Sequence, residues 1–586
     1  MLTGYDYLNI GFYFLFIAGV GVYFARQSRD TSDYFRGGGA LPWWITGSSA
    51  WMAGFSAWSF TGAAGKIYET GPYVLVLYYQ SVIPIVVLFC FTCYRFRRLR
   101  VVTPMEALRL RFGPGTQQFY TWLRLPIQLM FGAFALNAVS VFVSALFGFE
   151  VWPVLVLLGV LVTVLSLLGG ALGVAAGDFV QMFLIVLVAL STVVLALAHP
   201  AVGGLAGLVE RAPAAHFAWG RIARTEFISL WFIGLTLNTL FAFNSLSDEK
   251  AAKYMMAESD GHARRMLVIP FLGTVLGSFL WIIPPMAAAI AHPQIGQEFP
   301  MLRFPNEAAF LAIARDVLPQ GMLGLLICCI FAASLTDLGG ILNWGSGLLL
   351  RNFYLPVINP ACPEDRLVRL SRLGALLLGG VLIVFALLLS RYRSLGLFDL
   401  LNQFGTSLLM PLAIPAFLGI YFSRTPPWSA WSTAVLGLVM AGVAKFWVTP
   451  EMLAWVPGLG GPFLPEERTV FGIIATALLV GPTCVAWFFF TALFYRRSPA
   501  AHQERVAEFF ARLRTPLPDA AGAAHENRQV PRAIGRMCLL YGGFILLLTL
   551  IPNAPLGRIC YAACGGVLLA LGIVVTRRYR AAAPAT

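Results

Sequence analysis

Thr336 and Asp337 are adjacent oxygen-bearing side chains in the middle of a long apolar run. A carboxylate is costly to bury at membrane depth, so a residue of this kind marks a functional site by default. The hydroxyl and the carboxylate together offer hard oxygen ligands, which suit a small alkali cation or a proton. The alternative is a structural carboxylate that pairs with a neighbouring helix. We adopt the ion-site hypothesis for this pair.

Glycine and serine recur every few residues between Trp43 and Gly62. This spacing weakens a continuous helix and permits an unwound stretch. Free backbone carbonyls at membrane depth are tolerated only where they line a cavity or bind a ligand. Interrupted helices of this kind bind substrate and Na⁺ in inverted-repeat transporters. A packing seam of small residues between two helices is the alternative.

Asp178 follows a glycine-rich stretch and stands three residues before Gln181. It lies near the start of a predicted helix, where a carboxylate accepts hydrogen bonds from free amide groups. From position alone, capping is the favoured interpretation of Asp178.

The chain that positions these residues is strongly apolar. Of its 586 residues, 59% are hydrophobic and 12% are charged, with a mean hydropathy of +0.77, whereas soluble domains carry about 25% charged residues. Apolar runs of about twenty residues, long enough to cross a bilayer as helices, recur from end to end. The alternating pattern of an outer-membrane barrel is not seen. The composition predicts an all-α polytopic membrane protein with about fifteen spans.

The net charge of +14 follows membrane topology and does not indicate nucleic-acid binding. Basic residues gather in short loops between apolar runs, which is the pattern of cytoplasmic loops. Asp6 before the first run, with Arg26 and Arg29 after it, predicts a retained first helix and an outside N-terminus. The C-terminus is then cytoplasmic, and the short turn at 391–393 is the one discordant basic segment. The concordant basic segments are 95–100, 250–265, 496–497 and 577–580.

Several stretches resemble the sodium:solute symporter family, which carries sugars, inositol, proline, sialic acid, vitamins and monocarboxylates. Asp33–Trp44 resembles the beginning of the first core helix of the family, and Gly169–Gln181 resembles its Gly-Gly…Thr-Asp-x-x-Gln motif. Tyr254–Arg265 resembles the cytoplasmic segment after the sixth core helix, and Gly321–Tyr354 resembles the signature eighth core helix. The order of these matches makes the resemblance specific.

The resemblance implies a LeuT-type fold of two inverted five-helix repeats, with additional N- and C-terminal helices. Residues 1–495 are expected to form the transport domain and 496–533 a cytoplasmic linker, in which 504–513 is a candidate surface helix. Residues 534–586 are expected to hold two extra transmembrane helices and a short basic tail.

In the family, sodium is held by carbonyls of the interrupted first core helix and of the eighth, and by two adjacent hydroxyls on the eighth. Matched by position, the carbonyls are those of Met52, Phe55 and Ala333, and the hydroxyl pair falls on Thr336 and Asp337. The chain departs from the family at Asp337, because a carboxylate replaces the second hydroxyl. Either its full negative charge strengthens sodium binding, or a proton replaces sodium as the coupling ion.

The substrate positions match the family less closely. Gln403 matches a sugar-binding glutamine, whereas Ser59 and Tyr78 stand where sugar-carrying members have longer amide and acid side chains. Trp58 and Trp51 add aromatic surface, which suits stacking on a sugar or polyol ring and is equally ordinary packing.

Four further charged residues can be assigned to a role or excluded from one. Asp178 matches an acid that the family places on the inward exit path of the ion. Arg124 lies too close to the cytoplasmic end to bind a carboxylate substrate at the midplane. Lys66 and Glu69, three residues apart on one predicted helix, are expected to form a structural pair.

The resulting hypothesis is a Na⁺-coupled symporter for a small polar solute, with a sugar or polyol favoured. Its expected place is the cell membrane, inner or plasma, and its partners are the solute and the lipid bilayer, with the chain a monomer or weak homo-oligomer. The alternatives are a proton-coupled symporter that uses Asp337 and a solute-sensing membrane protein. The sequence offers no nucleophile–base pair or metal cluster, so an enzyme is not predicted.

Overall fold

The computed structural model describes residues 2–25, 41–101, 103–218, 223–248, 250–392, 396–456, 459–460, 462–517, 529–553 and 555–579. The side chains of 168–172, 364–365, 465 and 469 are not described. Most of the predicted Asp33–Trp44 motif, the end of the basic turn at 391–393 and the second half of the linker therefore lie outside the described residues.

The described part of the chain is helical and contains no strand beyond one isolated bridge, between Leu41 and Ala257. Thirteen helical segments in this part are long and apolar enough to cross a membrane. The two remaining predicted spans are the shorter apolar stretch Val151–Leu167, which is the first part of the helix Val151–Leu197, and the segment 42–66, which is interrupted. The prediction of an all-α polytopic protein is confirmed. The body of the molecule consists of α1 (Gly4–Ala25), α9 (Pro114–Phe147), α10 (Val151–Leu197), α13 (Thr225–Phe243), α17 (Ser278–Ala291), α20 (Met322–Leu349), α21 (Glu364–Tyr392), α23 (Met410–Tyr421), α24 (Ser429–Phe446), α25 (Pro465–Ala492), α27 (Gln529–Leu547) and α28 (Pro555–Arg578).

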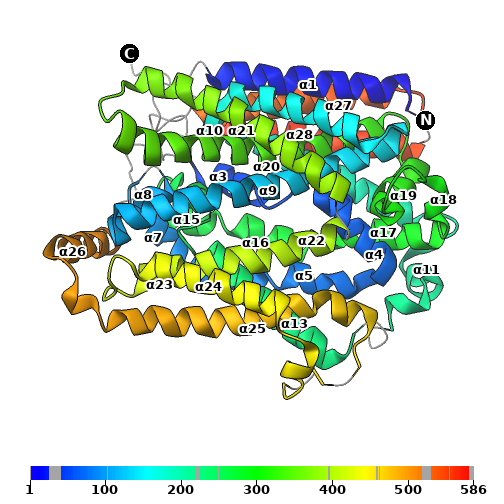
Figure 1. Cartoon of the computed structure of the whole chain (residues 1–586). Coiled ribbons are helices and arrows are strands. Elements are labelled where there is room, and N and C mark those ends of the chain that lie inside the picture. The colour runs from blue at the N-terminus through cyan, green and yellow to red at the C-terminus, as the bar shows by residue number, and fades with distance from the viewer. Residues whose placement is uncertain are drawn as a thin grey trace, which may run out of the picture.

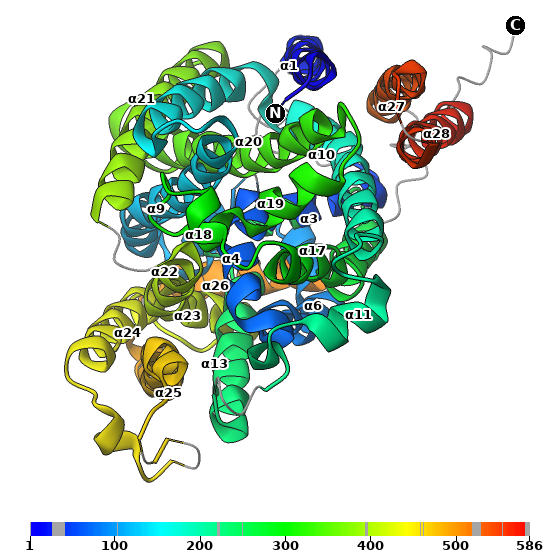
Figure 2. The same cartoon turned by 90° about the vertical axis from the view of Figure 1, so that its right-hand side faces the viewer.

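Most of the long helices run side by side in one direction, as expected for a membrane bundle (Figure 1). α26 (Ala500–Arg514) lies at one end of the bundle, and α11 (Gly204–Arg211) and α19 (Ala309–Val317) lie at the other. Viewed along the helices, α24 and α25 lie at one edge, and α27 and α28 lie at the opposite edge (Figure 2).

α20 is the central helix of the bundle. Its most apolar stretch is 83% buried, compared with 28% for the corresponding stretches of α1 and α21. On α1, Leu8, Leu15 and Val22 recur every seven residues and are exposed. Such a stripe faces lipid in a protein of this class, whereas α20 is enclosed by α9, α10 and α21.

The first predicted core helix is interrupted, as its glycine and serine spacing predicts. α3 (Trp43–Met52) ends, residues 53–56 are not helical, and the chain continues as η2 (Ala57–Phe60) and α4 (Gly62–Thr70). η2 packs against α9 and α20, so the interruption lies in the interior of the bundle.

The two C-terminal helices form a hairpin that packs through glycine. Gly535 and Gly542 on α27 face Gly572 and Gly565 on α28, and a Cβ at Gly565 would lie 2.9 Å from the Gly542 carbonyl oxygen. Small residues allow two membrane helices to approach closely. The hairpin contacts α10, and α1 meets α27 through two stacked rings, those of Phe12 and Phe544.

Arg111, on α8 (Pro104–Phe112), fastens the end of α23. Its side chain is fully buried, and it donates to the carbonyls of Gly419 and Phe422 and to the Thr425 hydroxyl, at 2.9, 2.6 and 2.6 Å. Burial lowers the pKa of Arg111 to about 9. Its guanidinium also lies 5.6 Å from the Phe510 ring of α26, the helix predicted within the linker.

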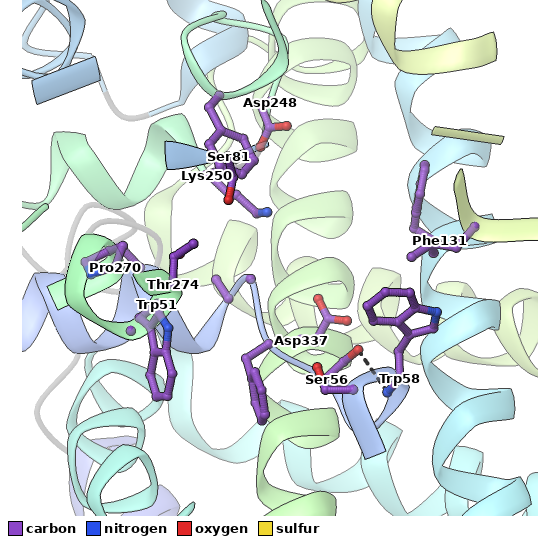
Figure 3. Close-up of a pocket in the computed structure, with 18 of the residues that line it drawn as sticks. Trp51, Ser56, Trp58, Ser81, Phe131, Asp248, Lys250, Pro270, Thr274 and Asp337 are labelled. Carbon is purple, nitrogen blue, oxygen red and sulfur yellow. Dashed lines mark hydrogen bonds between the residues drawn. The ribbon is translucent and has the colours of Figure 1, made fainter. Parts of the chain in front are cut away.

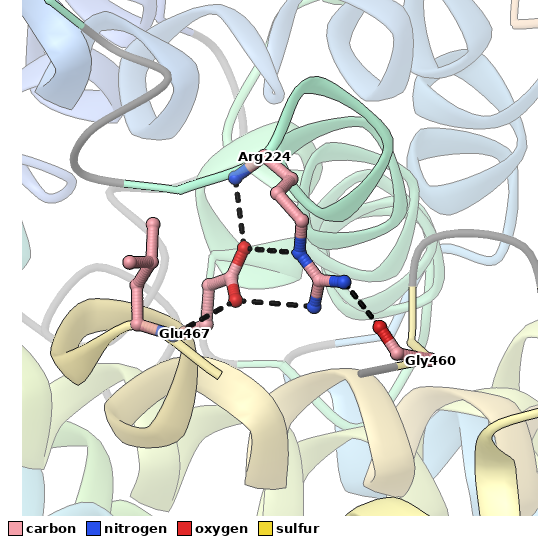
Figure 4. A network of polar contacts seen from close by, with 4 residues as sticks. Arg224, Gly460 and Glu467 are labelled. Atoms are coloured by element: carbon pink, nitrogen blue, oxygen red, sulfur yellow. Dashed lines mark hydrogen bonds and ion pairs between the residues drawn. The ribbon is translucent and has the colours of Figure 1, made fainter. Parts of the chain in front are cut away.

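A second buried charge joins the start of α13 to the start of α25 (Figure 4). Arg224 donates to Glu467 from its backbone N–H (2.8 Å), its Nε (2.9 Å) and its Nη2 (3.1 Å), and it also donates to the Gly460 carbonyl. The Glu467 side chain has no exposed surface and also accepts from the Leu464 amide at 3.1 Å. This bidentate pair fixes the loop before α25.

We expect Glu467→Gln to lower the free energy of unfolding by about 1–3 kcal/mol, because the neutral amide leaves Arg224 half-buried without its counter-charge. The measurement is the melting temperature of the purified protein in detergent. Glu451→Gln, at an exposed position of the same loop, is the matched control and should melt with the parent. Equal melting of all three proteins would contradict the assigned role.

Candidate functional site

A cavity of about 390 Å³ lies at the centre of the bundle, next to the interruption between α3 and η2. This volume falls within the range of about 300–1,000 Å³ typical of small-molecule sites. Its wall combines aromatic rings with amides and four charged side chains, Arg124, Asp248, Lys250 and Asp337. The cavity extends from the interruption towards α14 (Ala251–Met255).

Asp337 projects from α20 into this cavity, and the Lys250 side chain enters the same space from the opposite direction (Figure 3). The Lys250 ammonium lies 4.8 Å from the centre of the Phe243 ring. No ion pair within 4.0 Å joins Lys250 to a carboxylate of the described chain. The two charges therefore share the cavity without direct contact.

Aromatic side chains enclose the cavity on two sides, with Trp51 and Trp58 opposite each other (Figure 3). Trp51 stacks on Phe55 at 5.5 Å, and Trp58 stacks on Phe398 at 5.7 Å. Gly273 makes room for Trp51, because a Cβ at this glycine would lie 2.2 Å from the indole Nε1.

Several polar atoms in the wall are buried and have no hydrogen-bond partner within the described chain. Among them are Trp58 Nε1, Gln80 Oε1 and Arg124 Nε. Buried polar groups are normally paired, so unpaired ones that converge on a cavity indicate a polar ligand. Arg124 is 2% exposed and stands one turn from Gln128 on the face of α9 that lines the cavity.

Asp178 lies beside the cavity, at the centre of a hydrogen-bond network that joins four helices. It is 1% exposed. One carboxylate oxygen accepts from the Thr336 hydroxyl at 2.8 Å, and the other accepts from Ser49 on α3. The Lys253 ammonium donates to Ser49 at 2.8 Å and lies 4.0 Å from the second carboxylate oxygen. α3, α10, α14 and α20 therefore meet at one carboxylate.

Thr336 also donates to Gln181 Oε1 at 3.2 Å, and Gln181 donates to the Tyr13 hydroxyl at 3.3 Å. A small second cavity of about 60 Å³ lies on this side of Thr336, between α1, α10 and α20. The network thus continues from the α3 interface to α1.

The predicted sodium ligands lie on the elements that the prediction required. Met52 is the last residue of α3, Phe55 belongs to the non-helical stretch, and Ala333 lies in α20, which contacts α3. The adjacent side chains of Thr336 and Asp337 diverge, because the hydroxyl faces Asp178 whereas the carboxylate faces the large cavity. Asp178 is bonded to side chains of other helices, which is a different arrangement from a helix cap.

Three of the four predicted substrate residues, Ser59, Trp58 and Tyr78, line the large cavity. Gln403 does not, and its neighbour Asn402 on α22 (Leu397–Phe404) does. This one-residue difference follows from helical geometry, because adjacent side chains on a helix point about 100° apart.

Lys66 does not pair with Glu69, contrary to the sequence prediction. Its ammonium lies 2.7 Å from Glu466 of α25, and the two side chains are 8% and 14% exposed. Glu69 instead accepts from Asn306 at 2.8 Å. The pair predicted from spacing within one helix is replaced by a contact between distant segments.

Sequence reasoning missed Lys250 and Lys253 as site residues and excluded Arg124. The signal for Arg124 was present, since Arg124 and Gln128 are one turn apart in an otherwise apolar helix and share one face. The two lysines belong to the basic segment 250–265, which the sequence analysis interpreted only as a cytoplasmic loop. Nothing in their spacing shows that their side chains reach the interior of the bundle.

The comparisons with known proteins agree on one family. The model of the sodium:solute symporter family matches residues 34–437. A sodium/sialic acid symporter, NanT, of Aliivibrio fischeri is 24% identical over 463 residues, covering 76% of this chain and 87% of that protein. A sodium/glucose cotransporter of Vibrio parahaemolyticus is 23% identical over 479 residues, covering 76% and 86%. The human sodium/myo-inositol cotransporter 2 is 24% identical over 538 residues, covering 81% and 75%.

A solved structure has a similar fold. It is the substrate-bound, outward-open state of a Na⁺-coupled sialic acid symporter, with a TM-score of 0.66 and 18% sequence identity, covering 84% of this chain and 98% of that one. The predicted LeuT-type transporter fold is confirmed.

We expect Thr336→Val to destabilise the protein by about 1–3 kcal/mol, because the buried Asp178 carboxylate loses a hydrogen-bond donor. Thr336→Ser keeps the hydroxyl and should retain most of the stability. The measurement is the melting temperature of both variants in sodium-free buffer. A Thr336→Val protein that melts with the parent, or a smaller loss in Thr336→Val than in Thr336→Ser, would contradict the assigned role of the hydrogen bond.

Proposed function

Because the chain belongs to the sodium:solute symporter family, we propose that it carries a sugar or polyol together with Na⁺ by alternating access. The family and the relatives are transporters, not enzymes, as the sequence predicts. The observation that supports the proposal most directly is the central cavity, which has the interrupted α3 on one side and Asp337 of α20 on the other.

The chemistry of the residues present, hard oxygen atoms, suits a small alkali cation, although in this structure the Thr336 hydroxyl faces Asp178 and the Asp337 carboxylate faces the large cavity. Residues 53–56 lie outside helical structure, where backbone carbonyl oxygens can turn towards a ligand. The Met52 carbonyl accepts from the Phe55 amide at 3.0 Å, and the Ser56 carbonyl accepts from the Ser59 amide at 3.2 Å. Met52, Phe55, Ala333, Thr336 and Asp337 are the proposed sodium ligands. The driving force is the sodium gradient together with the membrane potential, whose electrical part is about 2.3 kcal/mol per charge per 100 mV.

Asp178 lies on the neighbouring helix α10 and accepts a hydrogen bond from Thr336. It is the proposed exit point for the ion. With the N-terminus outside and the C-terminus in the cytoplasm, the α14 end of the bundle is cytoplasmic. The cavity extends towards that end, whereas the Lys66–Glu466 pair bridges α4 and α25 near the other. This arrangement supports an inward-facing state of the transport cycle.

A sugar or polyol suits the cavity wall. Trp51 and Trp58 offer flat apolar surfaces for a ring, and Gln80 and Asn402 offer amide groups for hydroxyls. Ser59, Trp58, Tyr78 and Gln403 remain the proposed substrate residues, with Gln403 outside the cavity wall in this state.

A carboxylate-bearing solute is a second candidate, and Arg124 is the observation that favours it. Its guanidinium is buried in the cavity wall, and within the described chain no carboxylate lies within ion-pair distance of it. A buried, unpaired guanidinium is costly and favours an anionic ligand.

Uptake of a labelled solute into proteoliposomes should require Na⁺, and Asp337→Ser should keep this requirement at a higher half-saturating Na⁺ concentration. The serine supplies an oxygen ligand but not the negative charge that attracts the cation. The measurement compares NaCl with choline chloride at several pH values, with Asp337→Asn as an isosteric control. Full uptake without sodium, driven by a pH gradient, would instead support the proton-coupled alternative.

Glucose or myo-inositol should raise the melting temperature of the purified protein in NaCl more than in choline chloride, because ligands that favour the same state reinforce each other. The matched probes are glucuronate and N-acetylneuraminate, which add a carboxylate. If only the acids stabilise the protein, and Arg124→Gln removes their effect, the second candidate replaces the first.

A further inference from the structure

Lys253 brings a positive charge to a buried acid from a segment outside the central helices. It lies on α14, a helix of five residues that follows the turns after α13. Its side chain is 17% exposed, and its ammonium donates to Ser49 at 2.8 Å and lies 4.0 Å from Asp178. The long aliphatic stem carries the charge inward, while the backbone of Lys253 remains at the end of the bundle.

Asp178 has one positive partner and two hydroxyl donors within the described chain. The hydroxyls are those of Ser49 and Thr336, and the positive partner is Lys253. A carboxylate that is 1% exposed is strongly destabilising unless a counter-charge is present. Lys253 supplies that counter-charge. The same carboxylate accepts a hydrogen bond from Thr336, one of the proposed sodium ligands.

The Lys253 ammonium makes no direct hydrogen bond to the Asp178 carboxylate. A direct charge-assisted hydrogen bond between nitrogen and a carboxylate oxygen is about 2.7–2.9 Å long, whereas the Lys253–Asp178 separation is 4.0 Å. Ser49 holds the ammonium instead. Lysine is a compact charge on a flexible stem, so it can withdraw towards the α14 end without moving a transmembrane helix.

Lys250, one turn earlier, does not share this role. Its ammonium lies against the Phe243 ring in the large cavity. Among the described residues, Lys253 is the one cation within 4.0 Å of Asp178.

We propose that Lys253 is a tethered cation that competes with Na⁺ for the Asp178 carboxylate. The inference rests on the proposed function, in which Na⁺ leaves past Thr336 and Asp178. As the ion departs towards α14, Lys253 takes its place, so the acid never remains buried and unpaired. A sodium ion that enters from the same end must first displace Lys253, so the lysine weakens sodium binding from that end.

The test is direct ²²Na⁺ binding to the purified full-length protein by scintillation proximity, without solute and with choline chloride to hold ionic strength constant. Lys253→Met and Lys253→Gln remove the competing charge and should lower the half-saturating Na⁺ concentration about tenfold. In the parent, only the molecules in which Lys253 has withdrawn from Asp178 can bind Na⁺, whereas in these variants all molecules can. Lys253→Arg keeps the charge and should stay near the parent. Arg265→Met removes an exposed charge from the same cytoplasmic segment and should also match the parent.

Unchanged or weaker Na⁺ binding in folded Lys253→Met and Lys253→Gln would overturn the inference and leave the proposed function intact. Absence of Na⁺ binding in the parent and in every variant would overturn both. Folding is checked by the melting temperature in choline chloride. If the methionine variant is unfolded, the glutamine variant decides, because glutamine can keep the hydrogen bond to Ser49. Unfolding of both would assign Lys253 a structural role and overturn the inference.

Discussion

In a lipid bilayer, backbone carbonyls and amides must find partners within the protein, and this constraint determines where the chain can bind a polar solute. A continuous helix satisfies its own backbone, so a binding site needs a place where the helix stops. The stretch between α3 and η2 is such a place, and it is acceptable because it borders a cavity and packs against α9 and α20. The enclosure of α20 by α9, α10 and α21 keeps this stretch away from lipid.

The charged groups of the interior follow from the same constraint. Asp178 is bonded to Ser49 and Thr336 and faces Lys253, so helices from both halves of the chain are held around one carboxylate. Nearer the ends of the bundle, Glu467 and Arg111 each have several hydrogen-bond partners. In the cavity wall, by contrast, Arg124, Gln80 and Trp58 each have a buried polar atom without a partner in the described chain.

The fold was largely predictable because long runs of apolar residues identify membrane-spanning helices. The interruption after Met52 was also predictable, since glycine and serine recur there and weaken a helix. Contacts between distant segments were not predictable from the pattern. Spacing suggested that Lys66 pairs with Glu69, yet the structure pairs it with Glu466, four hundred residues away. The sequence placed Lys253 in a cytoplasmic loop. In the structure its flexible side chain reaches Asp178, and a hydropathy pattern does not predict how far a side chain reaches. Gln403 was chosen by family position, whereas helical rotation presents Asn402 to the cavity.

The Lys66–Glu466 contact also has a consequence for how the chain is divided. Lys66 lies within residues 34–437, which match the family, whereas Glu466 belongs to α25, beyond the end of that match. The ion pair at this end of the bundle therefore joins the matched core to a helix outside it. α25 is in turn anchored to α13 through Arg224 and Glu467. A helix beyond the matched core is therefore joined to it at its first turn by two ion pairs, Lys66–Glu466 and Arg224–Glu467.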